Sequence, residues 1–438
     1  MSATIQNHWL FGYFKPFVSK RVETLRHISE LGDVTRFRLL MGVNYMVSDP
    51  ELVAHVLLDP DNIFIKNRGF WGRFDDIFGQ GLVISEGDIW KKHRKLMAPA
   101  FQSKTVQTYF SCMIAEIDQY IGQWSHGQSV NVHQSMMDVT LNVLNACLFN
   151  VEFHDVKTQI VECIKQLESQ FALRVVRPFG FQNRWPSKIN KEYWAALAKI
   201  ESLVHQFIKN VRDKNDDKTL LDKLVNARDD AKGGLNDNEI RDELITLILA
   251  GHDTTSITVS WALYLLSQHS YLIESLRDEW LSLDPQNLDY NSLVKLPLTR
   301  GVLRETLRLY PPAYIIGREP LVDTKIGNVE IPKTFAVVIS PYAMGRDARF
   351  YHDPDKFIPQ RWNEEFEKQL PRFAFIPFGG GKRTCIGEQF AMAEAAILLW
   401  RILGKFNIEY TDSKPLQPAP VMTLTPRPFT LKLSNPTL

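Results

Sequence analysis

Four cysteines occur in the chain, and Cys385 is the one whose neighbours could give it a chemical role. It lies in residues 378–387, where four of the ten positions are glycine and would let the backbone approach a flat ligand closely. We expect a helix to begin near Glu388. Its positive end, together with two basic residues just before the cysteine, would favour a thiolate. A thiolate is a strong axial ligand for haem iron.

A second candidate site is a polar group in the middle of an apolar helix. The stretch 244–266 is the one long apolar run of the chain, and it carries Asp253 and Thr254 near its centre. Unpaired polar groups are costly among apolar neighbours, so packing alone does not account for them. Gly251 would leave room for a small molecule. A threonine hydroxyl that bonds the carbonyl four residues earlier would interrupt the helix and open a groove.

Two further pairs have helical spacing. Glu305 and Arg308 are three residues apart, and Trp90 and Arg94 are four apart, so each pair would share a helix face. Taken alone, both pairs are typical of solvated helix surfaces. An indole N–H and a guanidinium one turn apart could also reach the same anionic group, such as a propionate.

The composition excludes several classes of protein. The 438 residues carry 51 Lys and Arg against 50 Asp and Glu, a net charge of +1, so nothing indicates binding to nucleic acid. Apolar residues make up 45% and charged residues 23%, which excludes a disordered chain. Four cysteines are too few for a disulfide scaffold and favour a reducing compartment. The N-terminus lacks the features of a signal peptide, and the polar residues within 244–266 argue against a membrane span.

Hydrophobic periodicity predicts mostly helices between the candidate sites. The longest covers 236–267, with Asn236 or Asp237 as its cap. Other helices are expected at 105–124, 139–149, 157–175, 191–211, 299–309 and 388–403, and strands at 34–40, 44–47, 324–338 and 407–433. No linker or repeat divides the chain. We therefore expect a mainly α fold with small β-sheets in a single domain, 1–438. Its β-containing lobe would lie near 31–60 and 313–345 plus 407–433, and its helical lobe at about 85–310 and 388–404.

Together these motifs resemble those of the cytochrome P-450 superfamily. Residues 378–387 match the pattern F-x-x-G-x-R-x-C-x-G without a departure, and 250–255 match A-G-x-D-T-T. The helix with E-x-x-R, followed later by Arg361, and the W-x-x-x-R segment occur in the family's order. The resemblance implies that Cys385 ligates haem iron. It implies a set of cofactor-binding residues: Cys385, Arg383, Trp90, Arg94, His93, Arg318, Gly251, Phe378, Gly379 and Gly387.

The resemblance also implies roles for the remaining motifs. Thr254 would hold dioxygen or its water, and Asp253 would help to carry the two protons that cleavage of the O–O bond consumes. Glu305, Arg308 and Arg361 would form a buried structural triad that fixes the loop of Cys385. The other three cysteines, Cys112, Cys147 and Cys163, are interpreted as small apolar residues.

The function implied is that of a soluble, bacterial-type haem-thiolate monooxygenase. It would hold haem b (iron protoporphyrin IX), act as a cytoplasmic monomer, and take electrons from an external ferredoxin or flavodoxin with its NAD(P)H reductase. An acidic partner would dock on the face that carries four lysines, Lys91, Lys92, Lys95 and Lys382. Two alternatives remain open: a same-fold peroxide-driven enzyme, isomerase or dehydratase, and a non-enzymatic haem-based sensor.

The substrate cannot be read from the motifs, but aromatic residues suggest where it binds. One wall of the pocket is expected from Phe70, Trp71, Phe74 and Phe78, and the entrance from Phe171, Phe179, Phe181 and Trp185. Ordinary aromatic packing is the alternative interpretation of both groups. An aromatic pocket with few charges would suit a lipophilic substrate such as a fatty acid, a terpenoid or a steroid.

Overall fold

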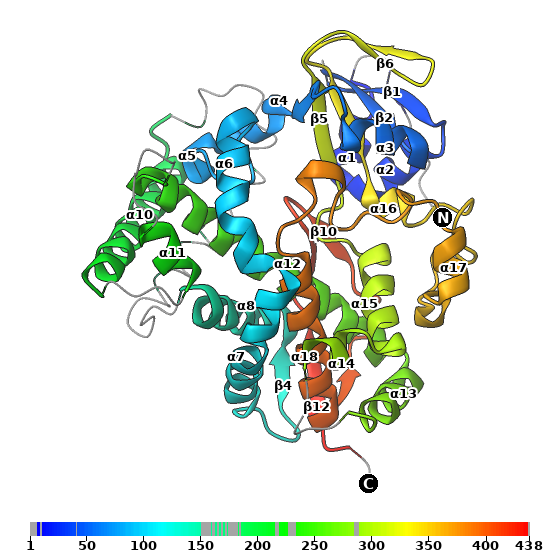
Figure 1. Ribbon diagram of the computed structural model, residues 1–438. Helices are drawn as coiled ribbons and strands as arrows, with labels where there is room; N and C mark the ends of the chain where they lie inside the picture. The colour runs from blue at the N-terminus through cyan, green and yellow to red at the C-terminus, as the bar shows by residue number, and fades with distance from the viewer. Residues whose placement is uncertain are drawn as a thin grey trace.

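The computed structural model contains a sheet-rich part, at the upper right of Figure 1, and a larger helical part. It describes residues 7–8, 11–40, 42–149, 185–214, 219–226, 234–283 and 289–436, and single positions between 159 and 183. The expected mainly α fold with small β-sheets is confirmed. Among the described helices, none is long and apolar enough to cross a lipid bilayer.

Five strands form the largest sheet, in the order β1–β2–β8–β5–β3. They are β1 (Val34–Leu39), β2 (Gly42–Val47), β8 (Ala336–Ile339), β5 (Ile316–Pro320) and β3 (Phe64–Lys66). Only β2 and β8 run parallel within this sheet. Its buried side chains pack on α3 (Pro50–Leu58). In the β3–β5 pair, Lys66 lies opposite Arg318, so the edge of the sheet brings two cations together.

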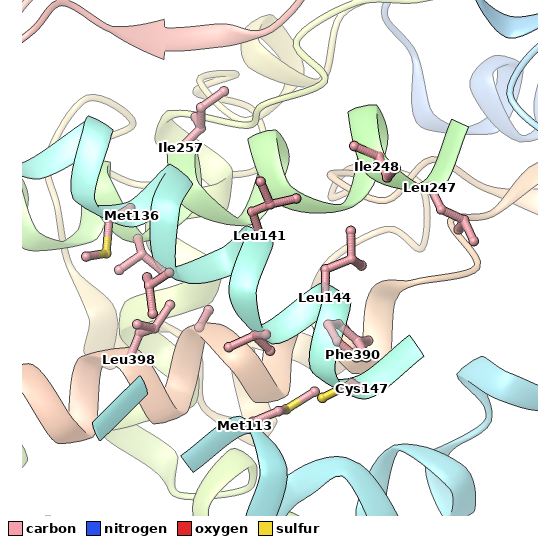
Figure 2. Packing of buried hydrophobic residues seen from close by; sticks show 14 of the residues in the cluster. Met113, Met136, Leu141, Leu144, Cys147, Leu247, Ile248, Ile257, Phe390 and Leu398 are labelled. Carbon is pink, nitrogen blue, oxygen red and sulfur yellow. The ribbon is translucent and has the colours of Figure 1, made fainter. Parts of the chain in front are cut away.

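The helical part is built around α12 (Asp237–Ser267), a helix of 31 residues. The side chain of Asn236 accepts from the Glu239 N–H, and the Glu239 side chain accepts from the Asn236 N–H, so the expected cap is a complete capping box. Figure 2 shows α8 (Val132–Leu144) lying between α12 and α18 (Glu388–Lys405), with apolar side chains from all three interleaved. Nearly every side chain of α12 on either side of its polar centre is buried.

The close approach of α8 to α12 depends on Gly251. A Cβ added at Gly251 would stand 3.0 Å from Cδ1 of Leu144, which points from α8 toward α12 in Figure 2. The expectation that Gly251 leaves room for a small molecule is therefore wrong, because the space beside its Cα is filled by Leu144. The helix also continues without interruption through residues 250–255.

The helices expected at 105–124, 191–211, 299–309 and 388–403 begin and end within a few residues of their predicted bounds. The helix expected at 139–149 begins seven residues earlier, at Val132, and ends as a π-helix, η3 (Asn145–Phe149). The stretch 157–175 lies largely outside the described residues. The remaining helical elements are α1 (Phe14–Ser19), α2 (Arg21–Ser29), α4 (Arg68–Trp71), η1 (Gly72–Phe74), α5 (Asp75–Phe78), α6 (Gly87–Met97), η2 (Ala98–Phe101), α7 (Ser103–Ile121), α10 (Lys188–Lys214), α11 (Leu220–Asn226), α13 (Ser270–Trp280), α14 (Tyr290–Val294), α16 (Pro341–Met344), α17 (Glu364–Gln369) and η6 (Gly381–Arg383).

The strands in 407–433, expected in the β-containing lobe, form no part of the large sheet. β9 (Asn407–Tyr410) and β12 (Thr430–Ser434) pair with β4 (Ser129–Asn131), and their apolar side chains belong to the core of the helical part. A separate hairpin is formed by β10 (Pro418–Pro420) and β11 (Leu424–Pro426), and another by β6 (Thr324–Ile326) and β7 (Val329–Ile331). Placing β9 and β12 in the β-containing lobe was wrong, because their partner is β4 of the helical part.

The three residues of the expected triad meet in the interior. Glu305 and Arg308 on α15 (Pro297–Leu309) are joined by two hydrogen bonds of 2.8 and 2.7 Å. Arg361, at the end of η5 (Pro359–Arg361), donates to the same carboxylate at 2.9 Å. Trp362 also donates to Glu305, and its ring lies 4.5 Å from that of Phe375, three residues before the Cys385 segment. The network therefore connects α15 to the start of that segment.

Replacing Glu305 with alanine is expected to destabilise the protein by about 3–5 kcal/mol, because two buried guanidinium groups would lose their anion. Urea unfolding and the haem-to-protein ratio would measure the effect. Glu364→Ala, which breaks the exposed pair of Glu364 with Lys368, is the matched control and should change neither quantity appreciably. An unchanged unfolding midpoint for Glu305→Ala would contradict the structural role of the triad.

Candidate active site

The Cys385 segment folds back on itself just before α18. The Cys385 N–H donates to the Phe378 carbonyl at 2.9 Å, and Gly379 and Gly381 adopt positive φ values of +73° and +66°. A Cβ at Gly381 would stand 2.0 Å from the Leu57 carbonyl oxygen, so this glycine is required by packing on α3. At Gly379 the nearest atom would be 3.9 Å away. Of these two positions, only Gly379 leaves space in which a ligand could approach.

The thiol of Cys385 is accessible, although desolvation raises its pKa. The N–H groups of Gly387 and Glu388 bond the sulfur and oppose the rise in pKa, as does the charge of Arg94. The N–H groups at the start of α18 thus favour the thiolate as expected, but the cation that acts with them is Arg94 rather than Lys382 or Arg383. Burial outweighs them, and a metal ion would have to displace the proton.

A group of cations lies beside this segment. Desolvation and the charge of Arg383 lower the pKa of Arg318 to about 10. Desolvation and the charges of Arg383 and Arg318 lower the pKa of Lys66 well below its ordinary value. Desolvation also lowers the pKa of Arg94, for which the described residues offer no hydrogen-bond partner. Like charges that face one another across paired strands are destabilising. The group is therefore adapted to hold an anion.

Glu86 and Trp90 contact one of these cations, Arg383. Arg383 pairs with the Glu86 carboxylate and donates to the Ser85 carbonyl at 2.9 Å. The Arg383 guanidinium also lies 4.0 Å from the centre of the Trp90 ring. One carboxylate cannot balance Lys66, Arg94, Arg318 and Arg383, so the site keeps an excess of positive charge.

His93 does not join this group. Its Nδ1 lies 2.6 Å from Glu243, and its Nε2 lies 3.4 Å from Glu239, so both ring nitrogens face carboxylates of α12. Desolvation lowers the pKa of His93, but the two carboxylates outweigh it and the net shift is upward. The expected propionate contact of His93 is not supported, because the ring already ties α6 to α12.

A cavity of about 1300 Å³ extends from α12 to the sheet. Asp253 and Thr254 line it from α12, and Lys66 and Arg318 line it from the sheet. The Thr254 hydroxyl donates to the Ala250 carbonyl at 2.9 Å, as expected, although the helix stays continuous. Desolvation raises the pKa of Asp253 to about 6, even though a hydrogen bond from Thr423 opposes the rise.

Three of the four aromatic residues expected in the pocket wall line this cavity, namely Phe70, Trp71 and Phe78. Phe74 does not: it is fully buried in the core, with its ring 5.6 Å from Phe70, so the packing interpretation holds for it. Phe171, Phe179 and Phe181 lie outside the described residues, and Trp185 is 66% exposed.

The four lysines of the expected partner face differ in their contacts. Lys91 pairs with Asp88 on its own helix, Lys92 pairs with Glu239, and Lys382 pairs with Asp59 at 3.4 Å. Lys95 is exposed. No disulfide joins the four cysteines, and Cys147 and Cys163 are buried.

Sequence reasoning missed several residues of the site. Lys66 and Glu86 belong to no motif, and only strand pairing and the loop fold bring them to Arg318 and Arg383. Glu394 was also missed. It is buried on α18, burial raises its pKa well above the ordinary value, and Thr255 of α12 bonds it. An acidic residue within an otherwise apolar helical stretch was the one available signal for Glu394.

Comparison with known proteins identifies the family. The model of the family described as Cytochrome P450 matches residues 3–433. The chain is 30% identical to cyclooctatin synthase from Streptomyces melanosporofaciens, over 96% of this chain and 92% of that protein. The chain belongs to the cytochrome P450 family. Pentalenene oxygenase from Streptomyces avermitilis is 29% identical over 97% and 95% of the two chains. The crystal structure of the cytochrome P450DA heme domain matches with a TM-score of 0.87 and 25% identity, over 99% and 97%.

As a cytochrome P450, the chain is a haem-thiolate monooxygenase, and its residues fit haem. The accessible sulfur of Cys385, with two N–H groups directed at it, suits an iron ligand. The excess of positive charge around Arg318 suits the two propionates, which would offset the repulsion among the cations. The residues that would hold haem are Cys385, Arg94, Arg318, Arg383, Lys66 and Trp90.

Lys66→Met is expected to weaken haem binding without destabilising the haem-free protein. The lysine charge is costly until an anion balances it, which is why its pKa is lowered. Transfer of haem to an excess of apomyoglobin should be faster by roughly tenfold, the effect of one lost charged hydrogen bond. Lys325→Met, on the exposed β6–β7 hairpin, is the control. Unchanged haem transfer would exclude Lys66 from the set of propionate contacts.

Proposed function

We propose that this cytochrome P450 inserts one oxygen atom from dioxygen into a neutral, lipophilic organic substrate, with electrons from a separate ferredoxin or flavodoxin and its NAD(P)H reductase. One observation carries the proposal: the acid and the alcohol of α12, Asp253 and Thr254, line a large cavity that also reaches the cations of the haem site. An acid beside an alcohol is suited to delivering protons.

The walls of the cavity support a neutral substrate. Most of the lining side chains are apolar, and many are aromatic. The arginines that line it away from the haem site are engaged: Arg21 donates to Tyr314 and to the carbonyls of Pro420 and Val421, and Arg73 donates to the Gly69 carbonyl at 2.9 Å. A carboxylate would therefore find no unpaired cation among the described residues away from the haem site. Two relatives are named for cyclooctatin and pentalenene, and we infer a lipophilic substrate here as well.

Haem b ligated by Cys385 would supply the metal centre at which dioxygen is reduced and its O–O bond is cleaved. The chain itself would supply the protons. Thr254 would hold dioxygen or a water through its hydroxyl, turning from the Ala250 carbonyl that it now contacts. Asp253, whose pKa of about 6 lies close to neutral pH, would pass protons onward because it can gain and lose them at little cost.

The proposal extends to the oligomeric state, the domain organisation and the cellular location of the chain. We propose that the chain acts as a monomer, that 1–438 forms one domain, and that it works in the cytoplasm. Four cysteines without a disulfide among them support a reducing compartment. Lys95 and Lys91 are the lysines best placed to meet an acidic electron donor, because Lys92 and Lys382 are held by contacts to other elements.

The function is tested with purified holoenzyme and a library of lipophilic compounds. A compound that shifts the haem spin state is then incubated with NAD(P)H and a ferredoxin or flavodoxin system, or with hydrogen peroxide alone. Oxygenated product in the first incubation, with incorporation of one atom from labelled dioxygen, is the expected result. Product formed equally well with peroxide alone, or rearranged product without oxygen, would support the peroxide-driven enzyme or the isomerase instead.

Cys385→Ala is expected to remove the thiolate signature of the reduced carbon monoxide complex. The reason is that no other described cysteine occupies the segment before α18. The Soret spectrum of the reduced protein under carbon monoxide measures this. Cys112→Ala, Cys147→Ala and Cys163→Ala should keep the thiolate band, and its persistence in Cys385→Ala would contradict the ligand assignment.

Thr254→Ala and Asp253→Asn are expected to fail in different ways. Loss of the hydroxyl should leave substrate binding unchanged but uncouple the reaction, so that NAD(P)H is consumed and hydrogen peroxide replaces product. Loss of the acid should slow turnover by roughly 10²–10⁴-fold, which is typical of a missing acid–base group. Product, peroxide and NAD(P)H are measured in the same reactions. If both variants were fast and fully coupled, α12 would have no role in activating oxygen.

A further inference from the structure

The hairpin β10–β11 brings two threonines to the cavity opposite α12. Thr423 and Thr425 both line the cavity, and their hydroxyls lie 3.0 Å apart. Between them, Leu424 is fully buried on the other side of the hairpin. This alternation follows from the period of two in an extended chain, which directs every second side chain to the same face.

The hairpin is fixed to the helix that carries the acid. The indole N–H of Trp261, eight residues after Asp253 on α12, donates to the Leu424 carbonyl at 2.9 Å. The Leu424 N–H donates to the Pro312 carbonyl at 2.9 Å. Both backbone groups of the residue between the threonines are therefore held, and the position of Thr423 relative to α12 is set by buried hydrogen bonds.

From this geometry we propose that Thr423 is a positioning residue for Asp253: its hydroxyl donates to the Asp253 carboxyl group and holds the acid in place for proton delivery. The inference deepens the proposed function and rests on it. Thr425 supports Thr423 in turn through the bond between their hydroxyls.

Other charged groups on the cavity do not account for the behaviour of Asp253. The titratable side chains that line the cavity from the neighbouring elements are His133 on α8, Arg21 on α2, Arg73 on η1, Lys66 on β3, Tyr314 just before β5 and Arg318 on β5. The pKa of Asp253 is raised by burial and lowered by the hydrogen bond from Thr423. Thr423 is thus the group whose removal should change the proton affinity of Asp253.

The protonation of Asp253 sets how the yield of product should depend on pH. Asp253 can give up a proton when its carboxyl group is protonated, below its pKa of about 6. The yield of product relative to hydrogen peroxide should therefore fall as pH rises through that value. Thr423→Val removes a bond that favours the carboxylate, so the pKa of Asp253 rises and the fall in yield moves upward by about one pH unit. The ratio of product to peroxide is measured because it does not depend on how fast electrons are supplied, since both products consume the same electrons.

The experiment compares holoenzyme variants over a range of pH with one substrate that shifts the haem spin state. Thr423→Val should show the displaced profile and, at its optimum, a several-fold higher peroxide-to-product ratio, because the acid is no longer held. Thr423→Ser keeps the hydroxyl and should restore both the profile and the ratio. Thr430→Val, on the exposed face of β12 and outside the cavity lining, is the matched control. Thr423→Ala replaces the valine variant if the latter fails to retain haem.

Asp253→Asn separates failure of this inference from failure of the proposed function. If it abolishes the pH dependence while Thr423→Val leaves profile and ratio unchanged, the positioning role of Thr423 is wrong and the proposed function stands. If Asp253→Asn itself leaves the profile unchanged, proton delivery by α12 is wrong and the inference falls with it. A displaced profile in Thr423→Ser as well as in Thr423→Val would also overturn the inference, since the hydroxyl would then not be the cause.

Discussion

The burial of α12 is the constraint on which the rest of the structure depends. A helix of 31 residues that is covered on most of its surface must satisfy its polar side chains internally or against its neighbours. Most of its serines and threonines do so by bonding carbonyls three or four residues earlier, as Thr258 and Ser260 show. Glu243 accepts from His93 of α6, and Trp261 donates to the β10–β11 hairpin. These two side chains of α12 thereby fix other elements.

The acid–alcohol pair is the exception that gives the helix a function. Asp253 and Thr254 face a cavity rather than a packed neighbour, and Asp253 remains only partly satisfied by Thr423. A carboxyl group in that position is costly to ionise, and this cost is what brings its pKa close to neutral pH. The same helix buries Gly251 against Leu144, so the close packing of α8 keeps the polar centre in register with the cavity.

A second feature of the structure is the group of like charges at the edge of the sheet. Lys66 and Arg318 are cross-strand neighbours, and Arg383 and Arg94 approach from the segment before α18 and from α6. Without an anion this arrangement is repulsive, so it is suited to holding an anionic group. The triad centred on Glu305 has the opposite character: its two cations are fully paired, and it contributes rigidity rather than affinity.

Much of this protein was determined by the sequence alone, because local patterns have local causes. The cap at Asn236 and the helix from Glu388 follow from residue types at fixed spacing. The triad of Glu305, Arg308 and Arg361 was expected from the resemblance of the motifs to a known family, because spacing alone did not separate it from a surface pair. Other features depended on segments far apart in the chain. Strand pairing placed Lys66 beside Arg318, and the approach of α6 to α12 brought the His93 ring within hydrogen-bond distance of Glu243. The pairing of β9 and β12 with β4, the packing of Gly251 on Leu144 and the contact of Thr423 with Asp253 have the same origin. Only the tertiary structure could decide them, because charge, burial and hydrogen bonding act between atoms that the fold brings together, whatever their distance in sequence.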